Sequence, residues 1–85
     1  MSYKIFIRKP AEKYIAKLDR PTRIRIINAI DNLSEDPAKG ELLTNHQATY
    51  KLRVGTYRIL YDVIATKVTV DIIKVGPREI GRAHV

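Results

Sequence analysis

The sequence has no cysteine, and its two histidines, His46 and His84, lie far apart in the chain. A chain without cysteine cannot form a disulfide or a cysteine-ligated metal centre, and two histidines are too few for a histidine-rich zinc site. We therefore expect no bound metal and no small-molecule cofactor.

Long apolar runs are also missing. The N-terminal segment MSYKIFIRKP alternates polar and apolar residues, which is typical of a strand and unlike a signal peptide or a transmembrane span. We therefore expect a cytoplasmic protein with no membrane partner.

Acidic residues are scarce relative to basic ones. Nine Asp and Glu stand against sixteen Lys and Arg, which gives a formal net charge of +7. Such a surface attracts polyanions, so by charge alone the partner could be nucleic acid, an acidic protein or a membrane surface. Eighty-five residues are enough for one domain with a single core.

The first half of the chain predicts a strand and two helices. Tyr3, Ile5 and Ile7 alternate with polar neighbours and with Phe6, as in a strand with a buried face. Pro10 and Pro21 suit the first turns of two amphipathic helices that form a hairpin. In the second helix the predicted apolar face contains Ile24, Ile26, Ile27, Ile30 and Leu33.

The second half predicts a loop and then strands. Residues 38–49 are polar and indicate a long connection. Three strand-like runs follow at Tyr50–Val54, Tyr57–Val63 and Val68–Val75. The order β-α-α-β-β-β predicts an α+β domain: one sheet that includes a three-stranded antiparallel meander, with both helices on one face.

The stretch YKLRVGTYRILYDV places basic residues at alternating strand positions. Tyrosine and apolar residues alternate with Lys51 and Arg53, so the cations are expected on the face away from the core. Arg58 follows across a two-residue turn, and Arg78 comes after the last strand, where Gly76-Pro77 is expected to turn the chain. The four cations would then line one basic surface. Alternatively, they only keep a solvated strand face from pairing with other chains.

The run YKLRVGTYRILY at residues 50–61, followed by KVGPR at 74–78, resembles the signature of the RelE/ParE superfamily of bacterial and archaeal toxins. The resemblance extends over the whole chain, because the preceding strand and helix hairpin match the family's order of elements. Members resembling RelE cut messenger RNA in the ribosomal A site, and members resembling ParE inhibit DNA gyrase. Both kinds are silenced by a partner antitoxin, here expected to be an acidic segment that folds onto the hairpin and the sheet edge.

By this resemblance, Lys51, Arg58 and Arg78 match cations of the ribonuclease site, and Arg53 occupies a neighbouring RNA-binding position. Cutting RNA without a metal requires a base, an acid and fixed positive charge around the phosphate. Arginine supplies the charge and can grip two phosphate oxygens at once. Glu41 lies near the position of a catalytic carboxylate in some relatives and is a candidate base.

Each of these assignments has a plainer alternative. Arg58 could pair with Asp62 or with a loop carboxylate, and Glu41 could be an ordinary surface residue. His46 fits an exposed polar residue of the loop. The three tyrosines of the opening run, Tyr50, Tyr57 and Tyr61, could stack on bases but are expected in the core.

The end of the chain departs from the family's pattern. Pro77 stands where many relatives have His or Lys, and no tyrosine follows Arg78. Residues 79–85, EIGRAHV, back-translate to one frame of a short-read sequencing adapter, which suggests a toxin domain at 1–78 and a non-native tail. The sequence therefore favours a ribosome-dependent, metal-independent endoribonuclease that acts on mRNA. The alternative is a gyrase inhibitor or a catalytically impaired toxin that still binds its antitoxin.

Overall fold

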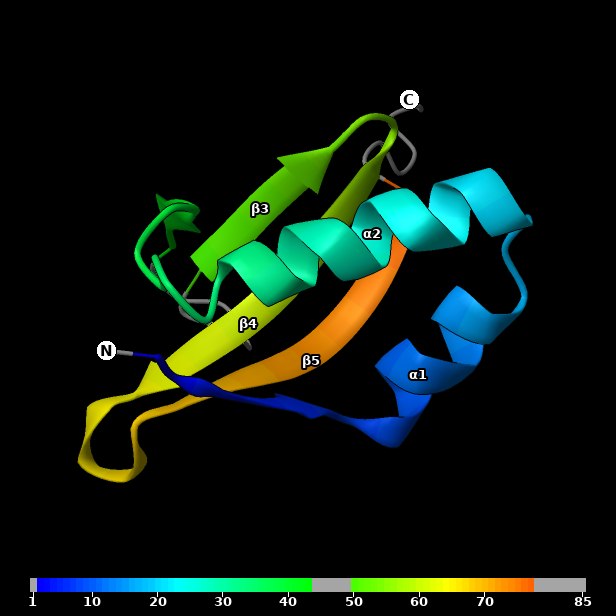
Figure 1. The fold of residues 1–85 in the computed structure, drawn as a ribbon. Coiled ribbons are helices and arrows are strands. Elements are labelled where there is room, and N and C mark those ends of the chain that lie inside the picture. Colours follow the sequence, from blue (N-terminus) through cyan, green and yellow to red (C-terminus); the bar gives the residue numbers. More distant parts are fainter. Residues whose placement is uncertain (1, 44–49, 78–85) are drawn as a thin grey trace.

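The computed structural model describes residues 2–43 and 50–77. In this part of the chain, two helices cover a five-stranded mixed sheet of strand order β1-β5-β4-β3-β2 (Figure 1). The elements are β1 (Lys4–Ile7), α1 (Lys9–Ala16), α2 (Arg20–Asn32), β2 (Glu41–Leu42), β3 (Tyr50–Val54), β4 (Tyr57–Ile64) and β5 (Thr69–Pro77). The predicted α+β class and the order of its main elements are confirmed.

The first strand pairs with the last one. β1 lies parallel to β5, with Ile5 opposite Val70 and Ile7 opposite Ile72. Ile5 and Ile7 pack against the core, whereas Phe6 points to the other face and is exposed. The predicted alternation of this strand is therefore confirmed.

A proline in the first turn starts each helix, because its missing N–H would be unpaired there in any case. In α2 the buried stripe consists of Ile26, Ile30 and Leu33, at the i, i+4, i+7 spacing of one helix face. The broader apolar face predicted from sequence is wrong, because Ile24 and Ile27 lie beside this stripe and are 47% and 41% exposed.

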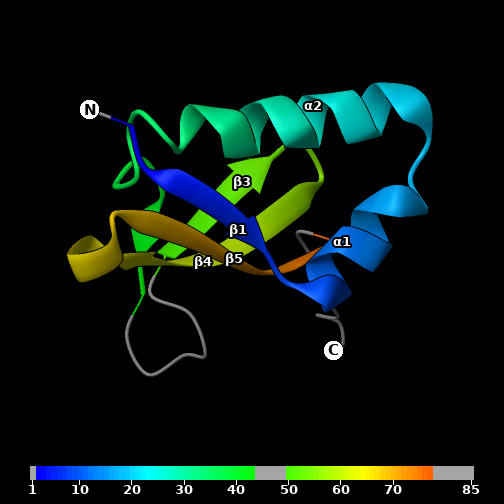
Figure 2. The same cartoon turned by 60° about the horizontal axis from the view of Figure 1, so that its bottom comes forward.

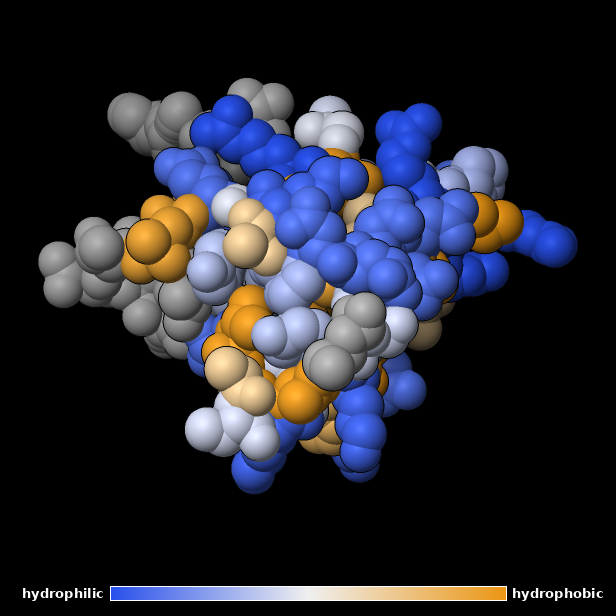
Figure 3. Space-filling view, turned by 60° about the vertical axis from the view of Figure 1, so that its left-hand side comes forward, coloured by the Kyte–Doolittle hydropathy of each residue, from blue (hydrophilic) through white to orange (hydrophobic). Residues whose placement is uncertain are grey.

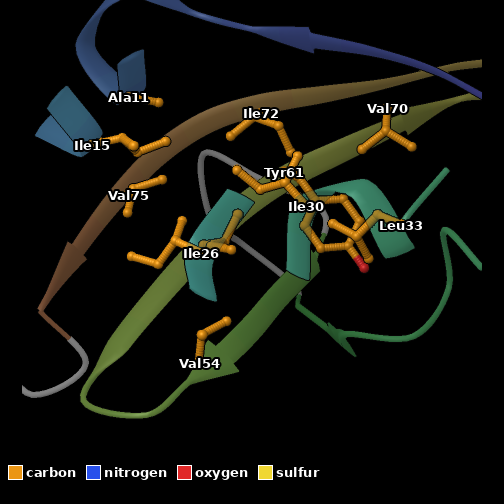
Figure 4. Close-up of a cluster of buried hydrophobic side chains, with 11 residues drawn as sticks. Ala11, Ile15, Ile26, Ile30, Leu33, Val54, Tyr61, Val70, Ile72 and Val75 are labelled. Atoms are coloured by element: carbon orange, nitrogen blue, oxygen red, sulfur yellow. The ribbon is translucent and has the colours of Figure 1, made fainter. Parts of the chain in front are cut away.

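The core lies between the helices and one face of the sheet (Figures 2 and 4). Figure 4 shows side chains of α2 and of the central strands pointing toward one another. The buried apolar residues are Ala11, Ile15, Ile26, Ile30, Leu33, Val54, Ile59, Tyr61, Val70, Ile72 and Val75. Each larger one contributes about 1.5–3 kcal/mol relative to leaving it exposed. In the described part of the chain, no helix covers the opposite face of the sheet.

The strands differ from the prediction in three places. The segment 38–49, expected as a loop, contains β2, which pairs antiparallel with the start of β3. The connection from β4 to β5 is a short 3-10 turn, so β5 begins at Thr69. Gly76 and Pro77 do not turn the chain; they continue β5, with Pro77 opposite Tyr57 at the strand end, where a missing N–H is tolerated.

Neither helix in residues 2–43 and 50–77 has the length and hydrophobicity needed to cross a membrane. On the face drawn in Figure 3, hydrophilic side chains predominate and apolar ones form small separate patches.

The start of α2 depends on the charge of Asp19. Its carboxylate accepts a hydrogen bond from the Thr22 backbone N–H at 3.4 Å, and the contact with Thr22 lowers the pKa of Asp19 from its ordinary value of 3.8. A carboxyl whose pKa is lower in the folded state stabilises the fold above its unfolded pKa, and this contribution is lost as the pH falls through the folded value.

We predict that Asp19→Ala lowers the urea midpoint at pH 7 and that the gap to the wild type narrows below about pH 4. Asp19→Asn is the control, because asparagine caps a helix without titrating and should stay close to the wild type at pH 7. A gap for Asp19→Ala that is unchanged between pH 7 and pH 3 would contradict a charge-dependent cap.

Candidate functional site

Lys51 and Glu41 face each other across the β2–β3 pair. Their backbones are in register, and the Lys51 Nζ lies 3.9 Å from Glu41 Oε1. The Lys51 side chain is 23% exposed and that of Glu41 is 62% exposed, so the pair borders solvent. The structure thus brings together two of the predicted site residues.

Arg53 and Arg58 lie directly opposite each other on β3 and β4. Residues opposite each other in an antiparallel pair have Cα atoms about 4.5–5.5 Å apart, and like charges there are destabilising. In residues 2–43 and 50–77, close ion pairs join Arg8 to Asp71 and Lys51 to Glu41. The alternative salt bridge of Arg58 stays a prediction.

Lys74 is a fourth cation on this face, and sequence reasoning missed it. Lys74 lies opposite Leu60, which lies opposite Lys51, so the three form one row across the sheet. Simple alternation from Val70 and Ile72 would place Lys74 in the core. The register shift between Leu60 and Tyr61 inserts one residue into β5 and reverses its later faces. The sequence gives one hint of this register shift: simple alternation would bury the charge of Lys74 in the core, where lysine is rarely found without a partner.

Gly76 is buried and lies directly opposite Arg58. The two residues are in register on β5 and β4, and a Cβ at Gly76 would have no atom of the described residues within 4 Å. We call Lys51, Arg53, Arg58 and Lys74 the cationic face; it lies on the side of the sheet away from the helices.

Tyr61 holds the segment that carries Glu41. The Tyr61 hydroxyl, on a fully buried side chain, donates to the Pro37 carbonyl at 2.8 Å and accepts from the Gly40 N–H at 3.0 Å. Burial raises the pKa of this hydroxyl, so it remains a neutral donor. A Cβ on Gly40 would lie 2.8 Å from the Lys51 carbonyl, so only glycine allows this approach.

The tyrosines pack as predicted rather than lining the cationic face. The Tyr50 ring stacks on Tyr61 with centroids 5.2 Å apart, and Tyr57 meets Tyr14 edge-on at 6.3 Å. All three tyrosines of the run contribute to the core or pack against it.

Two predicted positions cannot be placed. Arg78 and His46 lie outside the described residues. Within residues 2–43 and 50–77, no three His, Asp or Glu side chains gather closely enough to hold a metal ion.

Comparisons with known proteins agree with this geometry. The profile of the "ParE toxin of type II toxin-antitoxin system, parDE" matches residues 5–80. A chain of the toxin–antitoxin complex RelBE2 from Mycobacterium tuberculosis is 27% identical, with a TM-score of 0.83 over 92% of this chain and 93% of that chain. The isolated E. coli RelE toxin is 27% identical, with a TM-score of 0.81 over 95% and 89%.

An archaeal RelE–RelB complex from Pyrococcus horikoshii OT3 is 29% identical, with a TM-score of 0.80 over 98% of this chain and 100% of that chain. No curated protein sequence matches. The fold and the basic sheet face define a small toxin domain of α+β architecture. The chain belongs to the RelE/ParE superfamily of toxins from type II toxin–antitoxin systems, and the resemblance found in its sequence is confirmed.

We predict that Tyr61→Phe lowers the free energy of unfolding by about 1–2 kcal/mol, because the Gly40 N–H and the Pro37 carbonyl lose their partner. Denaturant unfolding measures the loss. Tyr57→Phe is the matched control, since it removes the same atom from β4 and its hydroxyl has no hydrogen-bond partner among the described residues. Equal effects of the two variants would show that the hydroxyl does not hold the segment.

Proposed function

We propose that this toxin is a ribosome-dependent, metal-independent endoribonuclease that cleaves messenger RNA in the A site. The observation that supports this most strongly is the pair Arg53 and Arg58, placed directly opposite each other on the sheet face away from the helices. Such a pair costs stability in the free protein, and a bound phosphate would offset that cost.

In the proposed reaction the cationic face binds the scissile phosphate. Arg58 grips two phosphate oxygens through its planar guanidinium group, while Arg53 binds the adjacent backbone. The charge that builds up on the phosphorane is greatest in the transition state, so fixed cations lower the barrier there. Arg78, which matches the family's arginine after the last strand, is proposed to complete this clamp.

Glu41 and Lys51 supply the proton transfers in this proposal. The Glu41 carboxylate takes the proton of the 2′-hydroxyl, whose oxygen attacks phosphorus, and the bond from phosphorus to the 5′-oxygen breaks. The Lys51 ammonium then gives a proton to the departing 5′-oxygen. The products are a 2′,3′-cyclic phosphate and a 5′-hydroxyl end, and the two side chains exchange their lost and gained protons through water.

The proposed partners follow from this reaction. The substrate is mRNA held on the ribosome, so the toxin works in the cytoplasm. We assign the activity to a toxin domain spanning residues 1–78, with residues 79–85 as a non-native tail.

Inhibition of DNA gyrase is a second candidate, favoured by the family profile of a ParE toxin. Pro77 also offers neither a titratable group nor a backbone N–H at the end of β5. A gyrase inhibitor would need the fold and its basic surface but no proton transfer at Lys51 and Glu41.

The deciding experiment is a translation reaction with purified ribosomes and a defined message, followed by mapping of new 5′ ends. We predict cleavage within the A-site codon, and a loss of about a hundredfold or more in rate for Arg58→Ala. Arg20→Ala removes the same charge from an exposed position at the start of α2 and should cleave like the wild type.

Two results would contradict the proposal. Intact message together with loss of gyrase supercoiling would favour the second candidate. Full activity of Arg58→Ala would show that the phosphate clamp is misassigned.

We further propose that an acidic antitoxin docks in a groove of about 510 Å³ between α2 and β3. Ile24 and Leu52 give the groove an apolar lining, and Arg25 and Arg53 contribute positive charge. β2 pairs only with Tyr50 and Lys51, so in the described residues the rest of the outer edge of β3 has no neighbouring strand. A helix and an extended segment of one antitoxin can therefore bind side by side. Homologous RelE toxins are found in complexes with RelB antitoxins.

We predict that Arg25→Glu weakens binding of the acidic antitoxin at least tenfold, because the reversed charge repels carboxylates at the groove. Lys17→Glu makes the same change of charge on an exposed residue after α1 and serves as control. Calorimetry with the protein encoded by the neighbouring acidic reading frame measures both. Equal affinities for the two variants would exclude the groove as the docking site.

A further inference from the structure

Phe6 is an exposed aromatic ring on the same sheet face as the cations. The Phe6 side chain is 58% exposed. Phe6 lies opposite Asp71 on β5, and Asp71 lies opposite Asp62 on β4. Single exposed apolar residues are common, so exposure alone means little. The residues around this ring indicate a binding site.

A hollow of about 340 Å³ lies beside Phe6. Two lysines, Lys4 and Lys67, contribute to its lining, together with Thr69 and Asp71. This volume is in the range of sites that hold small molecules or single groups of a larger ligand. The hollow therefore combines an aromatic surface, positive charge and hydrogen-bonding groups.

The carboxylate of Asp71 does not make the hollow anionic. Arg8 binds it with two nitrogens, Nε to Oδ1 at 3.1 Å and Nη2 to Oδ2 at 2.7 Å, and this contact raises the pKa of Arg8. Asp62 stands beside Asp71 and adds to the same shift. With Asp71 neutralised by Arg8, the two lysines leave the hollow attractive to an anion.

The turn that carries Lys67 is held in a strained conformation. Val68 has φ 48 and ψ 51, a left-handed backbone that β-branched residues rarely adopt. Its N–H binds the Ala65 carbonyl at 3.1 Å, and its carbonyl accepts the Lys4 N–H at 2.8 Å. These bonds fix the Lys67 turn against β1, so the two lysines and the ring form one preorganised unit.

A single-stranded RNA bound at the cationic face can also reach the hollow beside Phe6. Two strand spacings separate β1 from β4, about 10 Å, and four residues separate Asp62 from Arg58, about 13 Å. The resulting distance from Phe6 to Arg58 is about 16 Å along one open surface. A single-stranded RNA can extend over this distance, and every base has a face that stacks on an aromatic ring.

We propose that Phe6, Lys4 and Lys67 form a nucleotide subsite for single-stranded RNA, in which a base stacks on Phe6 and the lysines bind its phosphates. The subsite rests on the proposed RNA-directed function and extends it beyond the scissile phosphate. Stacking of this kind is tolerant of base identity, so the subsite adds affinity rather than sequence preference. A protein partner bound at this place would bury the charges of two lysines, whereas the phosphates of RNA pair with these charges.

The chain contains no tryptophan, so Phe6→Trp introduces a single fluorescent reporter. We expect a short single-stranded oligoadenylate to quench this fluorescence in a saturable way, and addition of salt to reverse the quenching. Replacing Lys4 and Lys67 by alanine in the same protein should weaken the quenching about tenfold or more. Ile27→Trp is the matched control, because Ile27 is 41% exposed on α2, on the opposite side of the sheet from the hollow, and should not be quenched.

Cleavage kinetics on programmed ribosomes complete the test. We expect Phe6→Ala and Phe6→Leu to raise the half-saturating ribosome concentration about tenfold with little change in the rate at saturation, and Phe6→Trp to match the wild type. Two results would overturn the subsite. The first is that RNA leaves the fluorescence of Phe6→Trp unchanged, even if RNA binds elsewhere on the protein. The second is that the acidic antitoxin quenches this fluorescence and RNA does not. If the wild type does not cleave at all, the proposed reaction fails, and the quenching measurement still decides whether RNA binds at Phe6.

Discussion

The buried hydroxyl of Tyr61 is the contact on which the arrangement of the site depends. It binds both Pro37 and Gly40, and so holds the polar segment that leads from α2 into the strand paired with β3. Without that strand Glu41 would not stand opposite Lys51. The same ring fills the centre of the core and stacks on Tyr50. One side chain therefore joins the stability of the domain to the geometry of its surface.

Charge is distributed unevenly over the two halves of the open sheet face. Near Phe6 a carboxylate and an arginine neutralise each other at 2.7 Å. On the cationic face the contact of Lys51 with Glu41 is longer, at 3.9 Å, and Arg53 lies opposite Arg58. Concentrating like charges in this way lowers the stability of the free domain and raises its affinity for an anion. Proteins commonly tolerate such a cost where a ligand binds.

Much of this could be predicted from sequence, because local patterns determine it. Alternation placed Ile5, Ile7, Lys51 and Arg53 on their correct faces, and prolines marked the starts of both helices. What failed depends on contacts between distant residues. The bulge that brings Lys74 to the cationic face arises only when β5 pairs with β4, and the segment before β2 is held by the distant Tyr61 hydroxyl. The turn predicted at Gly76-Pro77 is wrong because pairing with β4 overrides a turn-forming dipeptide at a strand end.

The parallel pairing of β1 with β5 affects the order in which the domain can fold during synthesis on the ribosome. β1 leaves the ribosome first, but the strand that it needs as a neighbour is made last, and contacts this distant in sequence form late in folding. Until β5 emerges, β4 lacks one neighbour and Lys74 is missing from the basic surface. The complete sheet and its full basic surface therefore form only after synthesis has passed β5.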